Sequence, residues 1–183
     1  MKLSLRNLTL ASIFTALMIA CAFVRIPFSF LPVTLQAFIC AVAGLFLGPR
    51  TGAISMAVSA LLGLSGLPVF AQGGGISYIF NGSFGFIAGF IAGTYVIGVI
   101  SRHNKNHGAA SLIKAVLAGL AVIYILGMAY MFIILRYYTG NTQAGILYII
   151  SMNLPYLAKD AILFIIAAFM YHYIYPHIKQ YIS

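Results

Sequence analysis

Asp160 is the only acidic side chain in a chain of 183 residues that carries ten lysines and arginines and a net charge of +9. It falls in an apolar stretch, about 154–175, at a depth of roughly 9 Å from the expected outer end. An ionisable group inside a membrane span is costly and marks a functional site by default. A carboxylate can accept two hydrogen bonds, which suits a ligand with two N–H donors. The alternative is a structural ion pair with Lys159, Arg136 or Arg25.

Other polar groups are expected at the same outer level. Gln36 and Asn81 stand at the starts of two predicted helices, where each amide could contact a ligand or serve as a helix cap. The run Gly73, Gly74, Gly75 permits unusual backbone angles and can present free N–H groups; a plain flexible turn is the alternative. Phe84 and Tyr156 are candidate apolar walls for a ring, or core residues.

The sequence contains no signature of catalysis, of metal binding or of a cofactor. It has no Ser-His-Asp or Cys-His set, no HExxH motif and no pair of carboxylates. It also lacks a Walker motif, so any ATP-driven work must come from partner chains. We therefore expect a protein that is not an enzyme.

The composition excludes a soluble protein. Hydrophobic residues make up 63% of the chain and charged residues only 6%, against about 25% charged residues in soluble domains. The basic residues stand singly at the ends of apolar runs, which indicates contact with phospholipid headgroups and not with nucleic acid. The chain is expected to be a single all-α membrane domain, residues 1–183.

The apolar stretches predict six transmembrane helices. Their approximate ranges are 7–24, 34–48, 52–67, 82–100, 110–137 and 154–175. Seven cations fall on the side of the termini and three on the other side, which places both termini in the cytoplasm. The seven are Lys2, Arg6, Arg50, Arg102, Lys105, Lys114 and Lys179, and the three are Arg25, Arg136 and Lys159.

The second and third helices are too short to cross a hydrocarbon core of about 30 Å. Non-helical backbone at that depth is tolerated only where it is buried or lines a cavity. This predicts an outward-facing cavity with Asp160 in its wall. The first helix carries small residues at four-residue spacing, Ser12, Ala16 and Ala20. Such a stripe packs inside a bundle or binds another membrane subunit.

Several motifs together resemble one family. They are Pro32-Val33-Thr34-Leu35-Gln36, the segments 43–53 and 62–70, the triple glycine, and Gly85-Phe86 leading into an Ala/Gly-rich helix. This pattern is similar to that of the BioY family, the biotin-binding S components of energy-coupling factor (ECF) transporters, over essentially the whole chain. The resemblance implies capture of biotin outside the cell. It also implies a membrane coupling subunit, which the first helix contacts, and two ATPases that drive release inside.

The resemblance also assigns roles to the candidate residues. The family's sixth helix typically reads Tyr-Leu-Pro-Gly-Asp-Leu-Leu-Lys, whereas this chain reads Tyr-Leu-Ala-Lys-Asp-Ala-Ile-Leu over 156–163. The Asp matches. The Lys that ends the family's motif is replaced by Leu163 here, and Lys159 supplies a cation from a neighbouring position instead. In biotin, the ureido N–H groups suit Asp160, the ureido carbonyl suits Asn81 or Gln36, and the rings suit Phe84 and Tyr156. The carboxylate suits Gly73–Gly75, Arg25 or Lys159.

We therefore expect a cell-membrane subunit that captures biotin with a site facing outside. Three alternatives stay open. The first is a solitary proton-coupled transporter with Asp160 as proton carrier, and the second is an intramembrane enzyme. The third is an S component for another vitamin, such as thiamine or riboflavin.

Overall fold

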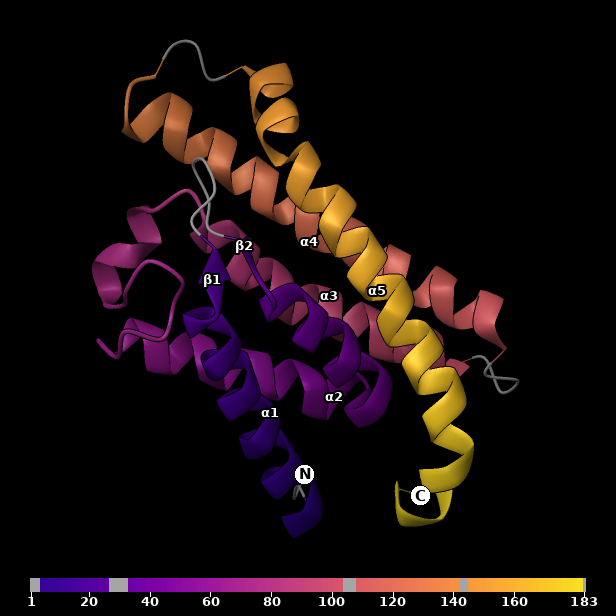
Figure 1. The fold of residues 1–183 in the computed structure, drawn as a ribbon. Helices are drawn as coiled ribbons and strands as arrows, with labels where there is room; N and C mark the ends of the chain where they lie inside the picture. The colour runs from indigo at the N-terminus through magenta and orange to yellow at the C-terminus, as the bar shows by residue number, and fades with distance from the viewer. Residues whose placement is uncertain (1–3, 27–32, 104–107, 142–144, 183) are drawn as a thin grey trace.

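The computed structural model describes residues 4–26, 33–103, 108–141 and 145–182. Five long helices dominate it (Figure 1). Their bounds are α1 Leu5–Phe23, α2 Gln36–Leu64, α3 Phe84–His103, α4 Ala109–Ile133 and α5 Ile146–Ile182. The shorter elements are β1 Arg25–Ile26, β2 Val33–Thr34, η1 Ile76–Phe80 and η2 Ile134–Tyr138. The strands β1 and β2 form a two-residue antiparallel ladder before α2.

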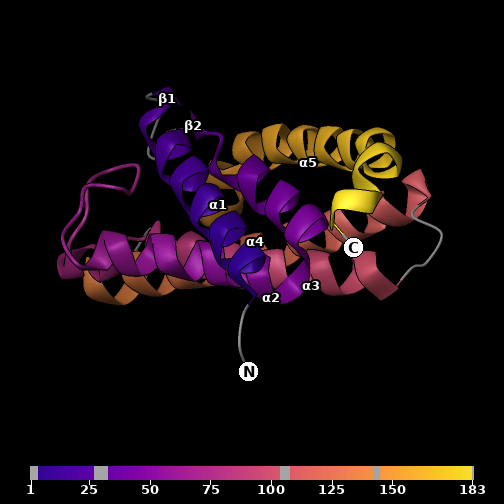
Figure 2. The same ribbon diagram turned by 90° about the horizontal axis from the view of Figure 1, so that it is seen from below.

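Helix α2 consists of two arms that fold back on each other at Gly48 (Figures 1 and 2). Gly48 has a φ of 78°, a conformation that glycine adopts without steric cost, and Pro49 begins the second arm. Cys40 Sγ lies 3.5 Å from Met56 Sδ, although a straight helix would separate the two residues by roughly 24 Å. The arms correspond to the predicted helices 34–48 and 52–67, but a sharp kink joins them instead of a loop.

Glycines allow the helices to pack closely around this kink. A Cβ atom on Gly98 of α3 would lie 2.3 Å from Pro49 N. Between α3 and α4, a Cβ on Gly93 would lie 2.8 Å from the Gly119 carbonyl oxygen. Helices in lipid associate through such close contacts because apolar side chains alone do not favour another helix over lipid. Arg102 also donates to the Leu47 carbonyl at 2.9 Å, which satisfies a carbonyl at the end of the first arm of α2.

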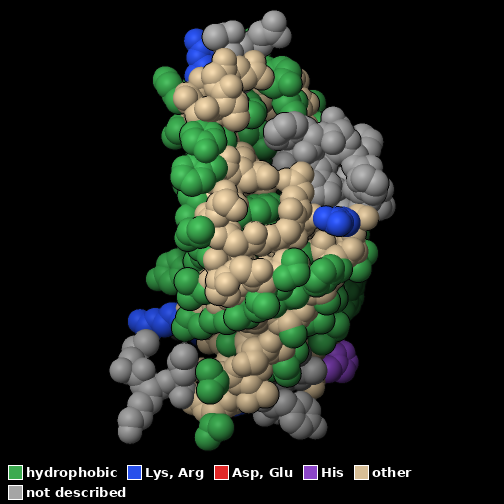
Figure 3. Space-filling model, turned by 90° about the vertical axis from the view of Figure 1, so that its left-hand side faces the viewer, with side chains coloured by type: hydrophobic (Ala, Val, Ile, Leu, Met, Phe, Trp, Pro, Cys, Tyr) green, Lys and Arg blue, Asp and Glu red, His purple; other side chains and the backbone are tan. Residues whose placement is uncertain are grey.

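Hydrophobic side chains are spread over the face of the molecule that Figure 3 shows, as expected for a protein in lipid. Large hydrophobic side chains are exposed on several helices, including Leu61 on α2, Ile125 on α4 and Leu147 on α5. All five helices meet the length and hydropathy expected of a membrane-spanning segment, α2 only when its two arms are counted together. The prediction of an all-helical, multi-pass membrane protein is confirmed at this level. Lys2 and Lys105, counted for the orientation, lie outside the described residues.

The predicted start of the last helix is wrong. Helix α5 begins at Ile146, so the connection expected over 138–153 is helical from that residue onward. Pro155 therefore lies well inside the helix and not in its first turn. Asp160 lies fourteen residues from the start of α5, roughly 21 Å along the axis and not the expected 9 Å or so. A proline removes one backbone N–H, a loss that neighbouring groups can compensate inside a helical bundle.

Candidate binding site

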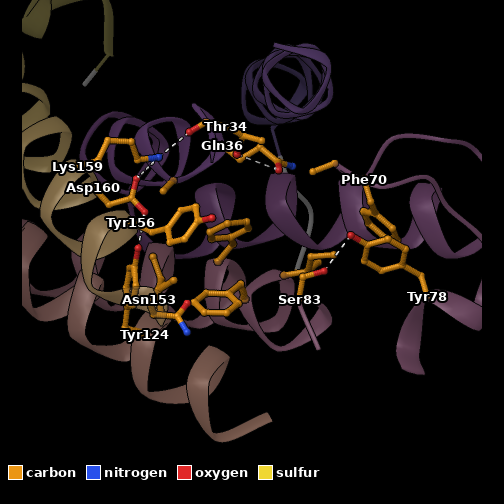
Figure 4. Close-up of a pocket in the computed structure, with 16 residues that line it drawn as sticks. Thr34, Gln36, Phe70, Tyr78, Ser83, Tyr124, Asn153, Tyr156, Lys159 and Asp160 are labelled. Atoms are coloured by element: carbon orange, nitrogen blue, oxygen red, sulfur yellow. Dashed lines mark hydrogen bonds and ion pairs between the residues drawn. The ribbon is translucent and has the colours of Figure 1, made fainter. Parts of the chain in front are cut away.

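A pocket opens where the first turn of α2, the segment after its second arm, and helices α3, α4 and α5 meet (Figure 4). The space that no atom fills, including the open mouth and the solvent in front of it, is about 690 Å³. Aromatic side chains make up much of the wall. They are Phe70, Tyr78, Phe86, Phe90, Tyr124 and Tyr156.

Asp160 lies in the wall of this pocket and is 6% exposed. Tyr124 donates its hydroxyl proton to Asp160 Oδ2 at 2.8 Å. The Lys159 ammonium lies 2.7 Å from Oδ1 as an ion pair, without the alignment of a hydrogen bond. Lys159 also donates to the Thr34 carbonyl at 2.8 Å. The carboxylate is therefore held from two sides, and Oδ1 keeps lone-pair capacity for a ligand donor.

Gln36 and Tyr156, which were predicted to contact a ligand, also line the pocket. Gln36 is buried in the first turn of α2, and its Oε1 lies 3.4 Å from Thr34 Oγ1. That contact directs the amide oxygen toward Thr34 and leaves the amide Nε2 as the donating end. Tyr156 lies one turn before Asp160 on the same face of α5. The structure thus brings together four of the predicted residues: Gln36, Tyr156, Lys159 and Asp160.

Asn81 lies outside the pocket lining and acts on it through Ser83. Its Oδ1 accepts hydrogen bonds from Ser83 N at 2.9 Å and from Ser83 Oγ at 2.8 Å. Because the Ser83 hydroxyl proton is engaged there, Tyr78 donates to Ser83 Oγ, 2.9 Å away. Burial raises the pKa of Tyr78 above its ordinary value, so this hydroxyl stays protonated and remains a donor. Asn81 Nδ2 donates to Gln72 Oε1 at 2.9 Å.

The three glycines also lie outside the lining, and two of their N–H groups bond to the chain itself. Gly73 N–H donates to the Phe70 carbonyl at 3.2 Å, and Gly75 N–H donates to the Gly63 carbonyl at 2.7 Å. Gly73 and Gly75 have φ values of 123° and 101°, which favour glycine. The glycines therefore shape the segment that carries Phe70 into the pocket.

Two further predicted contacts, Arg25 and Phe84, border the site without lining it. Arg25 is exposed and donates to the carbonyl of Ala71, which is a lining residue. The Phe84 ring packs against Tyr130, with ring centroids 5.8 Å apart. The ligand roles of Asn81, Gly73–Gly75, Arg25 and Phe84 stay predictions.

Sequence reasoning missed Asn153, which lines the pocket and is 2% exposed. The predicted last helix begins only at about residue 154, so Asn153 falls in the segment before it, whereas α5 begins at Ile146. The available signal was spacing: Asn153, Tyr156 and Asp160 stand at i, i+3 and i+7, which is one face of a helix.

The stripe of Ser12, Ala16 and Ala20 lies on the exposed side of α1. The residues of α1 buried against the bundle are instead Ala11, Thr15, Met18 and Ala22. Of the two alternatives for the stripe, packing inside this bundle does not occur in the structure. Binding to another subunit stays a prediction.

The fold and the pocket together define a multi-pass helical membrane protein with a buried carboxylate in the wall of an aromatic pocket. The family model of the BioY family matches residues 1–180. The chain therefore belongs to the BioY family, and the resemblance drawn from its motifs is confirmed.

Individual relatives agree with this assignment. "Biotin transporter BioY" of Thermotoga maritima is 34% identical over 166 residues, which cover 90% of this chain and 92% of the relative. "Probable biotin transporter BioY" of Lysinibacillus sphaericus is 37% identical over 130 residues, 71% of this chain and 66% of the relative. A crystal structure of the S-component for biotin from an ECF-type ABC transporter shares the fold. It has a TM-score of 0.69 at 24% identity and covers 91% of this chain and 89% of its own.

Proposed function

We propose that this chain captures biotin in the pocket around Asp160 and delivers it as the substrate-specific subunit of an ECF transporter. Membership in the BioY family, relatives described as biotin transporters and the S-component fold support the proposal. The observation that carries it is the chain's only carboxylate, which lies buried in the wall of an aromatic pocket. A carboxylate inside a membrane is costly, and here the ion pair with Lys159 and the hydrogen bond from Tyr124 hold it in the pocket wall.

The pocket matches the ring system of biotin. Asp160 Oδ1 accepts one ureido N–H, and the Gln36 amide donates to the ureido carbonyl. The apolar fused rings contact the aromatic wall, in which Phe86, Phe90 and Tyr156 face the same space.

Lys159 binds the carboxylate of biotin. An ammonium has three N–H donors. Here one bonds the Thr34 carbonyl, and the ammonium as a whole forms an ion pair with Asp160. We expect a remaining N–H to bond the ligand. The Lys159 side chain is 29% exposed, against 9% for that of Asp160, so it marks the more open end of the pocket.

In the membrane, the two arms of α2 count as separate crossings, which gives six in total. The arms have 12 and 16 residues, roughly 18 and 24 Å, so each is shorter than a hydrocarbon core of about 30 Å. The cation count favours both termini in the cytoplasm, and in that orientation we expect the pocket to open on the outer side. The exposed stripe of Ser12, Ala16 and Ala20 offers a flat face to the membrane coupling subunit, which associates with two ATPases.

Two measurements test the function. Calorimetric titration of the purified chain with biotin, thiamine and riboflavin is expected to show tight binding of biotin alone. Uptake of labelled biotin by cells that carry this chain is expected to depend on a co-expressed coupling module and on ATP. Uptake by the chain alone that survives ATP depletion and collapses with the proton gradient would favour the proton-coupled alternative. Tight binding of thiamine or riboflavin in place of biotin would overturn the assignment of the ligand.

A further inference from the structure

We infer that Asn153 is the second acceptor for the ureido ring, receiving through Oδ1 the N–H that Asp160 cannot reach. The inference rests on the proposed binding of biotin in this pocket. Asn153 Oδ1 is buried and has no hydrogen-bond partner in the described part of the chain, whereas Asp160 Oδ1, also buried, has the Lys159 ammonium 2.7 Å away as its ion-pair partner. Both residues line the pocket (Figure 4). A buried acceptor without a donor is destabilising, so Asn153 Oδ1 favours a ligand that brings an N–H.

The orientation of the Asn153 amide is fixed by its other end. Nδ2 donates to the Ile149 carbonyl at 2.9 Å and lies 3.5 Å from Met131 Sδ. Turning the amide over would place Oδ1 against a carbonyl oxygen, which is repulsive. The oxygen is therefore the atom that this side chain keeps for a ligand, and the site accepts a donor there and rejects another acceptor.

The geometry of a five-membered cyclic urea requires two acceptors. Its two N–H bonds point to nearly opposite sides of the ring, so one carboxylate can receive only one of them. With N–H···O distances of about 2.9 Å, the two acceptor oxygens lie roughly 8 Å apart. Asn153 and Asp160 are two helical turns apart on one face of α5, about 10 Å along the axis, and their side chains can close the difference. This replaces the expectation that Asp160 receives both N–H groups.

Asn153 then determines specificity for a urea over its closest analogues. If an oxygen replaces the N–H that faces Asn153, two acceptors meet in a buried site. The expected loss of affinity is about 10- to 100-fold, as for a buried polar group left unpaired. Asp160 imposes the same discrimination at the other ring nitrogen.

The test pairs protein variants with biotin analogues. Calorimetry measures the affinity of the purified chain for biotin and for its two cyclic carbamate analogues, in each of which one ring N–H is replaced by oxygen. Wild-type protein is expected to reject both analogues. Asn153→Leu is expected to bind biotin about 10- to 100-fold more weakly and to lose discrimination against one analogue only. Asn153→Ala, which leaves more room, is expected to show the same pattern.

Ser151→Ala is the matched control, because Ser151 is exposed on the same helix. It is expected to behave as wild type, and the unfolding temperature of every variant is measured alongside. The inference is overturned if both Asn153 variants bind biotin within twofold of wild type, or if they still reject both analogues. Absence of biotin binding to wild-type protein would instead refute the proposed function itself.

Discussion

Substituting Gly74 by Ala tests whether the glycine run shapes the pocket by packing. A Cβ atom on Gly74 would lie 2.0 Å from the Leu67 carbonyl oxygen and 3.0 Å from that of Gly63, whereas ordinary contact begins at 3.4 Å. Both neighbours are backbone atoms and cannot rotate away, so the segment must shift by more than an ångström. Overpacking of this kind costs about 1–3 kcal/mol. Because Phe70 and Ala71 of the same segment line the pocket, we expect the Kd for biotin to rise about 5- to 150-fold.

The assay for Gly74→Ala is calorimetric titration with biotin, combined with hydrogen exchange of the segment 65–81 without ligand. Displacement of the segment is expected to raise exchange in the unliganded protein, whereas loss of a direct ligand contact would change exchange only in the bound state. Gly145→Ala is the matched control, since a Cβ there meets nothing within 4 Å. A Gly74→Ala protein with wild-type affinity and wild-type exchange would refute the packing argument.

Three further substitutions address the kink, the carboxylate and the partner surface. Gly98→Ala places a Cβ 2.3 Å from Pro49 N, so the unfolding temperature is expected to fall by roughly 2–12 °C. Tyr124→Phe removes the hydroxyl that donates to Asp160, and the Kd for biotin is expected to rise about 10- to 100-fold in titration calorimetry. Ala16→Leu roughens the exposed stripe of α1; we expect normal biotin binding but loss of co-purification with the coupling subunit.

Each of these substitutions has a control of the same chemistry. Gly145→Ala again serves for the kink, and an unchanged unfolding temperature of Gly98→Ala would contradict the close contact at Pro49. Tyr137→Phe alters an exposed tyrosine on η2 and is expected to leave the affinity unchanged. Ala129→Leu adds the same bulk to an exposed position on α4. If it disrupts co-purification as much as Ala16→Leu does, the stripe is not the contact surface.

The general architecture could be predicted from the sequence because its physical causes are local. A 6% charged fraction excludes a solvated globule, and Gly48-Pro49 marks the point where α2 reverses. The start of α5 was misjudged because tyrosine and polar residues before Pro155 resemble a connection. In the structure, the buried side of that segment is formed by Ile149 and Asn153. Only the packing against α4 distinguishes such a helical face from a loop.

A site residue could be predicted from the sequence where the free-energy cost of burying its charge in a membrane is enough to identify it. A buried carboxylate is expensive wherever it lies in a membrane, so Asp160 was found without tertiary information. Asn81 and Gly73 could not be resolved in this way, because an amide or a glycine serves a turn as readily as a ligand. Here Asn81 holds Ser83, and Gly73 pairs with Phe70. Which partner each of these residues bonds depends on how the segment folds, and the residue types alone do not reveal it.

In the proposed binding mode, the pairing of Asp160 with Lys159 would let one pocket receive both ends of biotin. A lone carboxylate would repel the ligand's own carboxylate across a region of low dielectric constant. Neighbours on a helix point about 100° apart, so Lys159 reaches Asp160 only because its long stem bends back, and its bond to the Thr34 carbonyl holds it there. The pair is neutral as a unit, with an acceptor on one side and a donor on the other. That arrangement suits a neutral ring with an anionic tail, and it disfavours a cationic vitamin such as thiamine, whose charge would meet an ammonium.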